Sequence, residues 1–151
     1  MSRLDSDYPH ASQSPGLMLW RVTNAWQRAI RSALSPFDLT HVQFVLLAAL
    51  AHADPDEPMT QRDLADAAST DPMMTSQVVR ALERNGLVAR GAHPQDRRAV
   101  TVTPTPAGLA IVNRAVRAVE QTDRAYFAAL GAEQDRFTRM LGLLERNRGH
   151  D

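Results

Sequence analysis

Two helix starts close together in the middle of the chain constrain its fold more than any other feature. Thr60 followed by Asp63 is close to a capping box. Asp71 followed by Pro72 combines a good N-cap with a residue that loses no hydrogen bond at the first helical position. The residues at 69–70 between the two helices form a tight turn. The sequence therefore predicts a short helix, a turn and a second helix.

A β-hairpin is expected directly after the second of these helices. Gly86 is well placed as the left-handed stop of that helix. Segments rich in β-branched residues at 87–90 and 99–103 then flank a polar stretch at 91–98. Two helices joined by a turn and followed by a hairpin are the layout of a winged helix-turn-helix, which we place at residues 58–104.

Longer helices flank this unit on both sides. Apolar residues recur at spacings of three and four from Leu17 onward, and Ser35-Pro36 ends that helix. A capping box at residues 40–43 opens the next one. Thr105-Pro106 opens a helix of about 26 residues, which Gly131 breaks before a last helix. On the helix that begins at residue 40, the expected buried stripe is Val42, Val45, Leu46, Ala49 and Leu50.

Composition excludes several classes of protein. The 151 residues include no Cys, which removes disulfides, thiol catalysis and cysteine redox sensing. No run of about 18 apolar residues indicates a membrane span. Residues 1–16 are polar and lack the charged and apolar regions of a signal peptide, so we expect a disordered or loosely ordered tail there and a cytoplasmic protein.

Positive charge is concentrated in the predicted helix-turn-helix and hairpin. The formal net charge of the chain is zero, so it carries no global signature of nucleic-acid binding. The stretch 76–98, however, holds five Arg against Glu83 and Asp96. Every basic residue of the chain is Arg, whose planar fork suits phosphate and guanine.

Several segments of this chain, in order, resemble the MarR family. Residues 94–99 are similar to the family's Asp-x-Arg wing signature, in which the Asp orients the Arg toward DNA. The resemblance implies a mainly α fold with a small β-hairpin wing. In that fold residues 17–151 form one domain, a winged helix-turn-helix with N- and C-terminal dimerisation helices at 17–34 and 105–148. The segments are Leu39-Thr40-His41-Val42-Gln43-Phe44, Leu64-Ala65, Val79-Arg80-Ala81-Leu82-Glu83-Arg84-Asn85-Gly86-Leu87, Asp96-Arg97-Arg98-Ala99 and 105–108.

The resemblance implies a sequence-specific DNA-binding transcriptional regulator. It would be a homodimer on a near-palindromic operator in double-stranded DNA, and a repressor released by a small aromatic or phenolic ligand. No cofactor and no enzymatic activity are expected, because the chain has no Gly-rich phosphate loop and no Gly-x-Ser-x-Gly motif. The alternative is a winged-helix protein-interaction module without DNA binding, for which paired Arg at the wing tip would have no evident use.

Carried over to this sequence, the DNA-binding face consists of the second helix of the motif and the wing tip. Gln77 can pair bidentately with adenine, and Arg80 with guanine or a phosphate. Met73 can contact a thymine methyl group, although Met73-Met74 departs from the Ser, Thr and Arg commoner in the family at that turn. The expected DNA-binding residues are Asp71, Pro72, Met73, Ser76, Gln77, Arg80, Arg84, Asp96, Arg97 and Arg98.

Each of these assignments has a purely structural alternative. Arg80 and Arg84 would together form a solvated helix face with Glu83. Asp96 and Arg98 would form a salt bridge within a turn. The two Arg at the wing tip are the more informative pair, because a loop has no amphipathic face to fill.

The first two helices hold the candidates for an effector pocket, because the family's pocket often lies there. Aromatic and Met residues at helical spacing are more often core, so core packing is the alternative. No His stands four residues from another His, and no His forms a ligand-like pattern with a carboxylate, so no metal site is expected. The candidate ligand-binding residues are Met18, Trp20, Trp26, His41 and Phe44.

Overall fold

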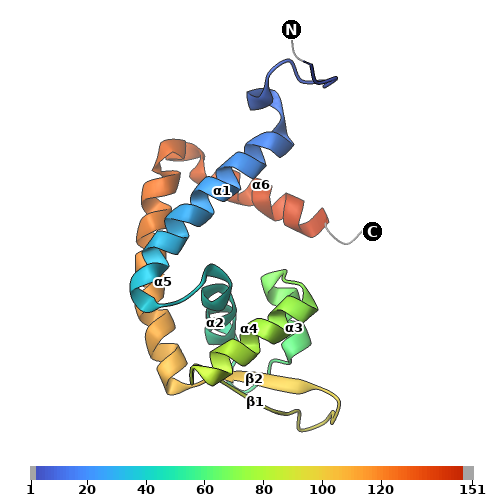
Figure 1. The fold of residues 1–151 in the computed structure, drawn as a ribbon, viewed down its shortest axis with the longest axis vertical. Helices are drawn as coiled ribbons and strands as arrows, with labels where there is room; N and C mark the ends of the chain where they lie inside the picture. The colour runs from blue at the N-terminus through green and yellow to red at the C-terminus, as the bar shows by residue number, and fades with distance from the viewer. Residues whose placement is uncertain (1–2, 148–151) are drawn as a thin grey trace.

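Over residues 3–147 the chain folds into a mainly helical structure with one β-hairpin, as the sequence predicts (Figure 1). We describe it from a computed structural model covering residues 3–147. The end of the expected domain, 148–151, lies outside that range. The elements are η1 (Ala11–Gln13), α1 (Pro15–Leu34), η2 (Ser35–Phe37), α2 (His41–His52), α3 (Gln61–Ala68), α4 (Pro72–Arg84), β1 (Val88–Ala92), β2 (Val100–Pro104), α5 (Pro106–Phe127), η3 (Ala128–Glu133) and α6 (Gln134–Arg146).

The predicted caps are confirmed. The Thr60 hydroxyl accepts a hydrogen bond from the Asp63 amide at 3.0 Å, and the Asp63 carboxylate accepts from the Thr60 amide at 3.1 Å. The Asp71 carboxylate accepts from the Met74 amide at 2.9 Å. Helices α2 and α5 also begin on their predicted caps. Local hydrogen bonds therefore place the starts of both helices of the motif.

The hairpin is attached to the start of α3. Strands β1 and β2 are antiparallel, and Val88 pairs with Pro104. The Val102 amide donates to the Met59 carbonyl at 2.9 Å, and Thr60 forms an isolated bridge with Thr101. Both strands end later than the pattern predicted: Gly91 and Ala92 extend β1 by pairing with Thr101 and Val100, and Pro104 extends β2 by pairing with Val88. The hairpin is thus held by the helix-turn-helix that precedes it.

A single cluster of buried side chains joins α2, α3, α4 and the hairpin to the end of α1 and the first half of α5. On α2 only Leu46 and Leu50 of the predicted stripe are buried, together with Phe44 and Leu47, which it did not include; the other three predicted positions, Val42, Val45 and Ala49, are half-buried. The reason is that α2 packs against α1, α3, α4 and α5, so it has no fully exposed face. The cluster is Ile30, Leu34, Leu39, Phe44, Leu46, Leu47, Leu50, Leu64, Val79, Leu82, Val88, Val102, Val112, Ala115 and Val119.

The helix ends differ from their predicted positions at two places. Helix α1 begins at Pro15, where the Ser14 hydroxyl accepts from the Leu17 amide, so helical structure starts inside the expected tail. The α-helical part of α5 ends at Phe127 and is therefore shorter than the expected 26 or so residues. The last turn winds into a 3-10 helix before the predicted break at Gly131, whose φ is 55°.

Helices α1, α5 and α6 form a second region with little burial of its own. Figure 1 shows α1 running along α5, and α6 turning back from the end of α5. Helix α6 has no buried residue. Its apolar side chains Met140, Leu141, Leu143 and Leu144 are exposed by 39–63%. An amphipathic helix whose apolar side meets solvent indicates a missing partner.

By length and composition, no one helix within residues 3–147 suffices to cross a membrane. The helical segments Pro15–Phe37 and His41–His52 are long and apolar enough only when they are counted together, and the chain bends by 76° between them.

Candidate nucleic-acid interface

Helix α4 divides cleanly into an inner and an outer face. Thr75, Val79 and Leu82 are buried against the core. Seven of the ten predicted DNA-binding residues belong to this element and its cap. Of these, Ser76 is half-buried and the others are exposed: Asp71, Pro72, Met73, Gln77, Arg80 and Arg84.

A buried hydroxyl locks the turn between α3 and α4. The Thr75 hydroxyl donates to the Asp71 carbonyl at 2.8 Å and lies 2.6 Å from the Thr70 hydroxyl. The Thr75 side chain is fully buried. Since a buried polar group is stable only when hydrogen-bonded, this pair fixes the angle at which α4 leaves the turn. Sequence reasoning missed Thr75, although a lone Thr on the apolar face of α4 was a detectable signal.

The wing tip is ordered by hydrogen bonds within the loop. The Asp96 carboxylate accepts from the Arg98 amide at 3.0 Å, and its carbonyl accepts from the Ala99 amide at 3.1 Å. The His93 amide donates to the Ala99 carbonyl at 3.3 Å. Asp96 therefore acts on the backbone of Arg98, and the side chains of Arg97 and Arg98 remain exposed. This arrangement differs from the side-chain salt bridge considered as an alternative.

An ion pair joins the end of α4 to the hairpin. The Glu83 carboxylate accepts from Arg90 Nη2 at 3.0 Å, Arg90 Nε at 3.2 Å and the Arg90 amide at 3.3 Å. Hydrogen bonding from Arg90 holds the pKa of Glu83 below its usual range. Glu83 is thus engaged with the hairpin, and the positive charge of Arg80 and Arg84 stays on the outer face of α4.

This ion pair predicts a pH-dependent contribution to stability. Because the folded-state pKa of Glu83 is lowered, its contribution is present above the ordinary carboxyl pKa and lost as the pH falls through the folded-state value. We expect Glu83→Gln to lower Tm at pH 7 by more than it does at about pH 3. Thermal melts of both proteins test this, and a Tm difference that stays constant across that range would contradict the assigned pairing.

A cleft beside the wing brings in residues that the sequence reasoning did not select. Gln61 and Arg62, at the start of α3, line it together with Asp96 and Arg98. The positive end of the α3 dipole points to the same place. The first turn of α3 therefore borders the candidate interface, and the sequence signalled this turn only through its cap at Thr60.

The five candidate ligand-binding residues separate into three places. Trp26 and His41 are in edge-to-face contact with 5.2 Å between ring centroids, and Trp26 Nε1 donates to Asp123 of α5 at 2.8 Å. Phe44 is buried in the core, 7% exposed. Met18 and Trp20 line a separate shallow cleft on α1 with Arg21, Val22, Asn24, Ala25, Arg28 and Tyr126.

The Trp26–His41 contact lies where α1, α2 and α5 meet. Burial lowers the pKa of His41, and the nearby Arg31 lowers it further. This shift favours the neutral imidazole as the ring that contacts Trp26. Within residues 3–147, no group of three or more His, Asp or Glu is arranged to hold a metal ion.

Comparisons with known proteins agree with this geometry. The MarR family profile matches residues 39–100. The uncharacterized HTH-type transcriptional regulator YdcH of Bacillus subtilis is 44% identical over 128 residues, which are 82% of this chain and 85% of that protein. The HTH-type transcriptional repressor Rv2887 of Mycobacterium tuberculosis is 36% identical over 127 residues, 83% and 89% of the two chains.

Two solved structures have the same fold. CouR from Rhodococcus jostii RHA1, bound to p-coumaroyl-CoA, gives a TM-score of 0.80 at 27% identity and covers 91% of this chain and 94% of its own. The MarR family protein Rv2887 of Mycobacterium tuberculosis, in complex with DNA, gives a TM-score of 0.68 at 33% identity. The match covers 87% of this chain and 97% of the Rv2887 chain. On its fold, its helix-turn-helix and wing, and its identity to these relatives, the chain belongs to the MarR family of winged-helix transcriptional regulators.

Proposed function

We propose that this protein is a sequence-specific DNA-binding transcriptional regulator that works as a homodimer. The observation that carries the proposal is that Gln77 and Arg80 of α4 and Arg97 and Arg98 of the loop between β1 and β2 are all exposed. Figure 1 shows α4 and the hairpin at the same end of the molecule. Rv2887, a relative described as a repressor, was crystallised with DNA, which supports repression here. Such a role places the protein with the chromosome in the cytoplasm.

The exposed residues divide into base-reading and phosphate-binding groups. Gln77 is suited to adenine, and Arg80 to guanine or a phosphate, because both project from the outer face of α4 into a major groove. Arg97 and Arg98 are suited to the adjacent minor groove, where the potential is most negative. Arg62, beside Arg98 in the cleft at the wing, and Arg84, at the end of α4, suit flanking phosphates.

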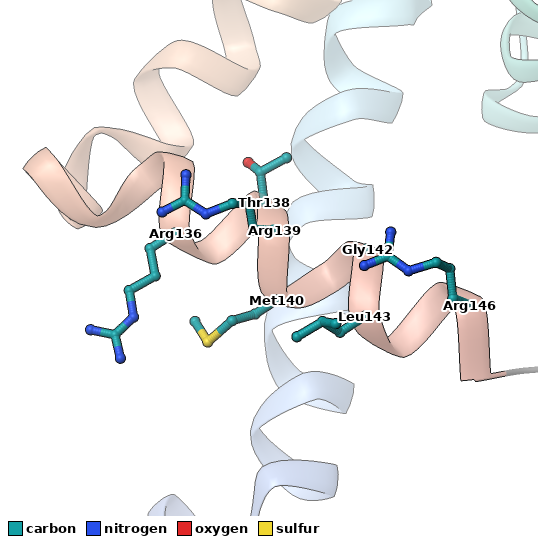
Figure 2. Close-up of a pocket in the computed structure, with 7 residues that line it drawn as sticks. All are labelled: Arg136, Thr138, Arg139, Met140, Gly142, Leu143 and Arg146. Atoms are coloured by element: carbon teal, nitrogen blue, oxygen red, sulfur yellow. The ribbon is translucent and has the colours of Figure 1, made fainter.

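The exposed apolar side of α6 supports dimerisation. Figure 2 shows Met140 and Leu143 pointing to the same side of α6, while Arg146 lies back over Gly142. Leu17, Leu19 and Trp20 of α1 are also exposed, by 45–70%. A second copy that covers both helices buries these side chains and sets two α4 helices at a fixed separation, which a near-palindromic operator requires.

An aromatic or phenolic effector suits the junction of α1, α2 and α5. Trp26 of α1 contacts both His41 at the start of α2 and Asp123 of α5. An aromatic ring that displaced one of these contacts would shift α2, which packs on α3 and α4. CouR, a structural neighbour, is bound to p-coumaroyl-CoA, an aromatic acyl thioester, and this supports the same class of ligand.

Salt dependence of binding tests the proposed function. A duplex selected from a random library by the full-length protein is titrated by fluorescence anisotropy at about 50 and 200 mM salt, where several phosphate contacts predict an affinity loss of 10³-fold or more. Equal weak binding to every duplex would favour the alternative, a winged-helix protein-interaction module.

The wing makes a separate prediction. Arg98→Ala removes one phosphate or minor-groove contact per protomer, so we expect weaker binding. The slope of log affinity against log salt concentration is expected to become smaller by about one for each wing on the duplex. Arg117→Ala, which changes an exposed arginine in the middle of α5, is the matched control. If both variants lose the same slope, the wing assignment is wrong.

A further inference from the structure

The first turn of α4 exposes apolar surface at the tip of an otherwise polar outer face. Met73 is 72% exposed and Met74 is 38% exposed, while the core-facing positions of the helix begin at Thr75. Single exposed apolar residues are ordinary. Two in succession at the leading turn of the helix proposed to meet DNA give that face an apolar end, which the assignment of Gln77 and the Arg residues does not use.

The backbone that carries Met73 is held rigidly. The Met74 amide donates to the Asp71 carboxylate at 2.9 Å, and the Thr75 amide donates to the Asp71 carbonyl at 2.8 Å. The Thr75 hydroxyl donates to that same carbonyl at 2.8 Å. The turn is thus fixed before any partner arrives, and only the Met73 side chain has to settle, which a flexible thioether does readily.

Met73 lies on the same stripe of α4 as the polar residues assigned to DNA. Gln77, Arg80 and Arg84 follow it at intervals of three and four residues, so the four side chains project in one direction. A partner for this stripe must offer negative charge beside Arg80 and Arg84 and an apolar group at the other end. DNA provides both, because the C5 methyl of thymine is the apolar group of the major groove.

We propose that Met73 is a specificity-determining residue that reads a thymine methyl group in each operator half-site. The inference rests on the proposed function. Four helical residues span about 6 Å, or about two base pairs, so the thymine lies within that distance of the base pair that Gln77 contacts. The Met pair replaces hydrogen-bond readout at this step with shape and apolar contact.

Uracil interference tests the inference, because deoxyuridine differs from thymidine only by that methyl group. A duplex selected by the full-length protein is synthesised with one thymine at a time replaced by deoxyuridine, and Kd is measured for wild type, Met73→Ala and Arg98→Ala. For wild type we expect about fourfold weaker binding for the contacted thymine in each half-site, the value of one buried methyl. For Met73→Ala we expect no loss at that thymine.

The Arg98→Ala variant separates methyl readout from weak binding in general. It binds less tightly overall and is expected to keep the fourfold thymine preference, because the wing lies apart from the first turn of α4. A wild-type protein that binds its selected duplex but shows the same deoxyuridine profile as Met73→Ala overturns the inference and leaves the proposed function standing. A protein that selects no duplex overturns the proposed function itself.

Discussion

Replacing both Leu143 and Leu144 by Arg is expected to give a folded monomer that binds its operator about 100-fold more weakly or worse. Both side chains lie on α6 and are more than 60% exposed, and no residue of this helix is buried within the chain. In a dimer the new guanidinium groups would meet an apolar surface without a partner charge. A monomer then loses the gain of 10²–10⁴ that two linked binding sites provide.

The measurement is sedimentation or light scattering, followed by titration of the selected duplex. Val100→Arg is the matched control for oligomeric state, since Val100 is 40% exposed on β2 of the hairpin, outside the predicted dimerisation helices. It is expected to leave the dimer intact. Should the α6 variant remain a dimer, the interface between protomers lies elsewhere and the role given to α6 is wrong.

The second large effect is expected from Gly108→Ala, at the joint between the hairpin and α5. A Cβ on residue 108 would overlap the carbonyl oxygen of Leu87 and lie 3.0 Å from its carbonyl carbon. That carbonyl cannot move away freely, because it accepts from the Thr105 amide at 3.0 Å. The Thr105 hydroxyl adds a further restraint by donating to the Gly86 carbonyl at 2.6 Å.

We expect Gly108→Ala to lower the free energy of unfolding by about 3 kcal/mol or more, since a clash with fixed backbone exceeds ordinary overpacking. Urea denaturation at one protein concentration measures it. Gly16→Ala, at a helical position with open space around the added Cβ, is expected to be neutral or slightly stabilising. Similar stability of the two variants would contradict the close approach described at this joint.

The parts of this structure that depend on neighbours in sequence were predictable. Caps at Thr60, Asp71 and Thr105 each need only a hydroxyl or carboxylate three residues before a free amide, and all three form. Gly86 adopts the left-handed conformation, with φ at 73°, that its place after α4 predicted. The order of helices and hairpin follows from these signals.

What depends on distant residues was not predictable. The hydrogen bond from Trp26 to Asp123 joins residues 97 apart, and no local pattern indicates which carboxylate an indole will reach. The pairing of Glu83 with Arg90 depends on where β1 begins, which the pattern placed only approximately. For this reason the sequence suggests Arg80 and Arg84, its neighbours on the helix, as partners of Glu83, and gives no sign of Arg90 on the strand.

The candidate site shows the same division. Composition and spacing predicted the outer face of α4 and the wing tip, because helical periodicity and a polar loop indicate solvent exposure without information on distant contacts. They did not select Arg62, which lies beside Arg98 only because Thr60 and Met59 bond to β2. The five effector candidates were grouped by helix, whereas packing separates them into core, junction and outer cleft.

The most direct test of the central claim is to sequence the fragments of the source genome that the full-length protein binds, with Gln77→Ala as a parallel sample. We predict a recurring near-palindrome whose half-sites are centred about one helical turn apart, with a base preference in each half-site that Gln77→Ala relaxes. A bound set with no shared sequence, or an identical motif for both proteins, would contradict the account of a dimer that reads DNA through α4.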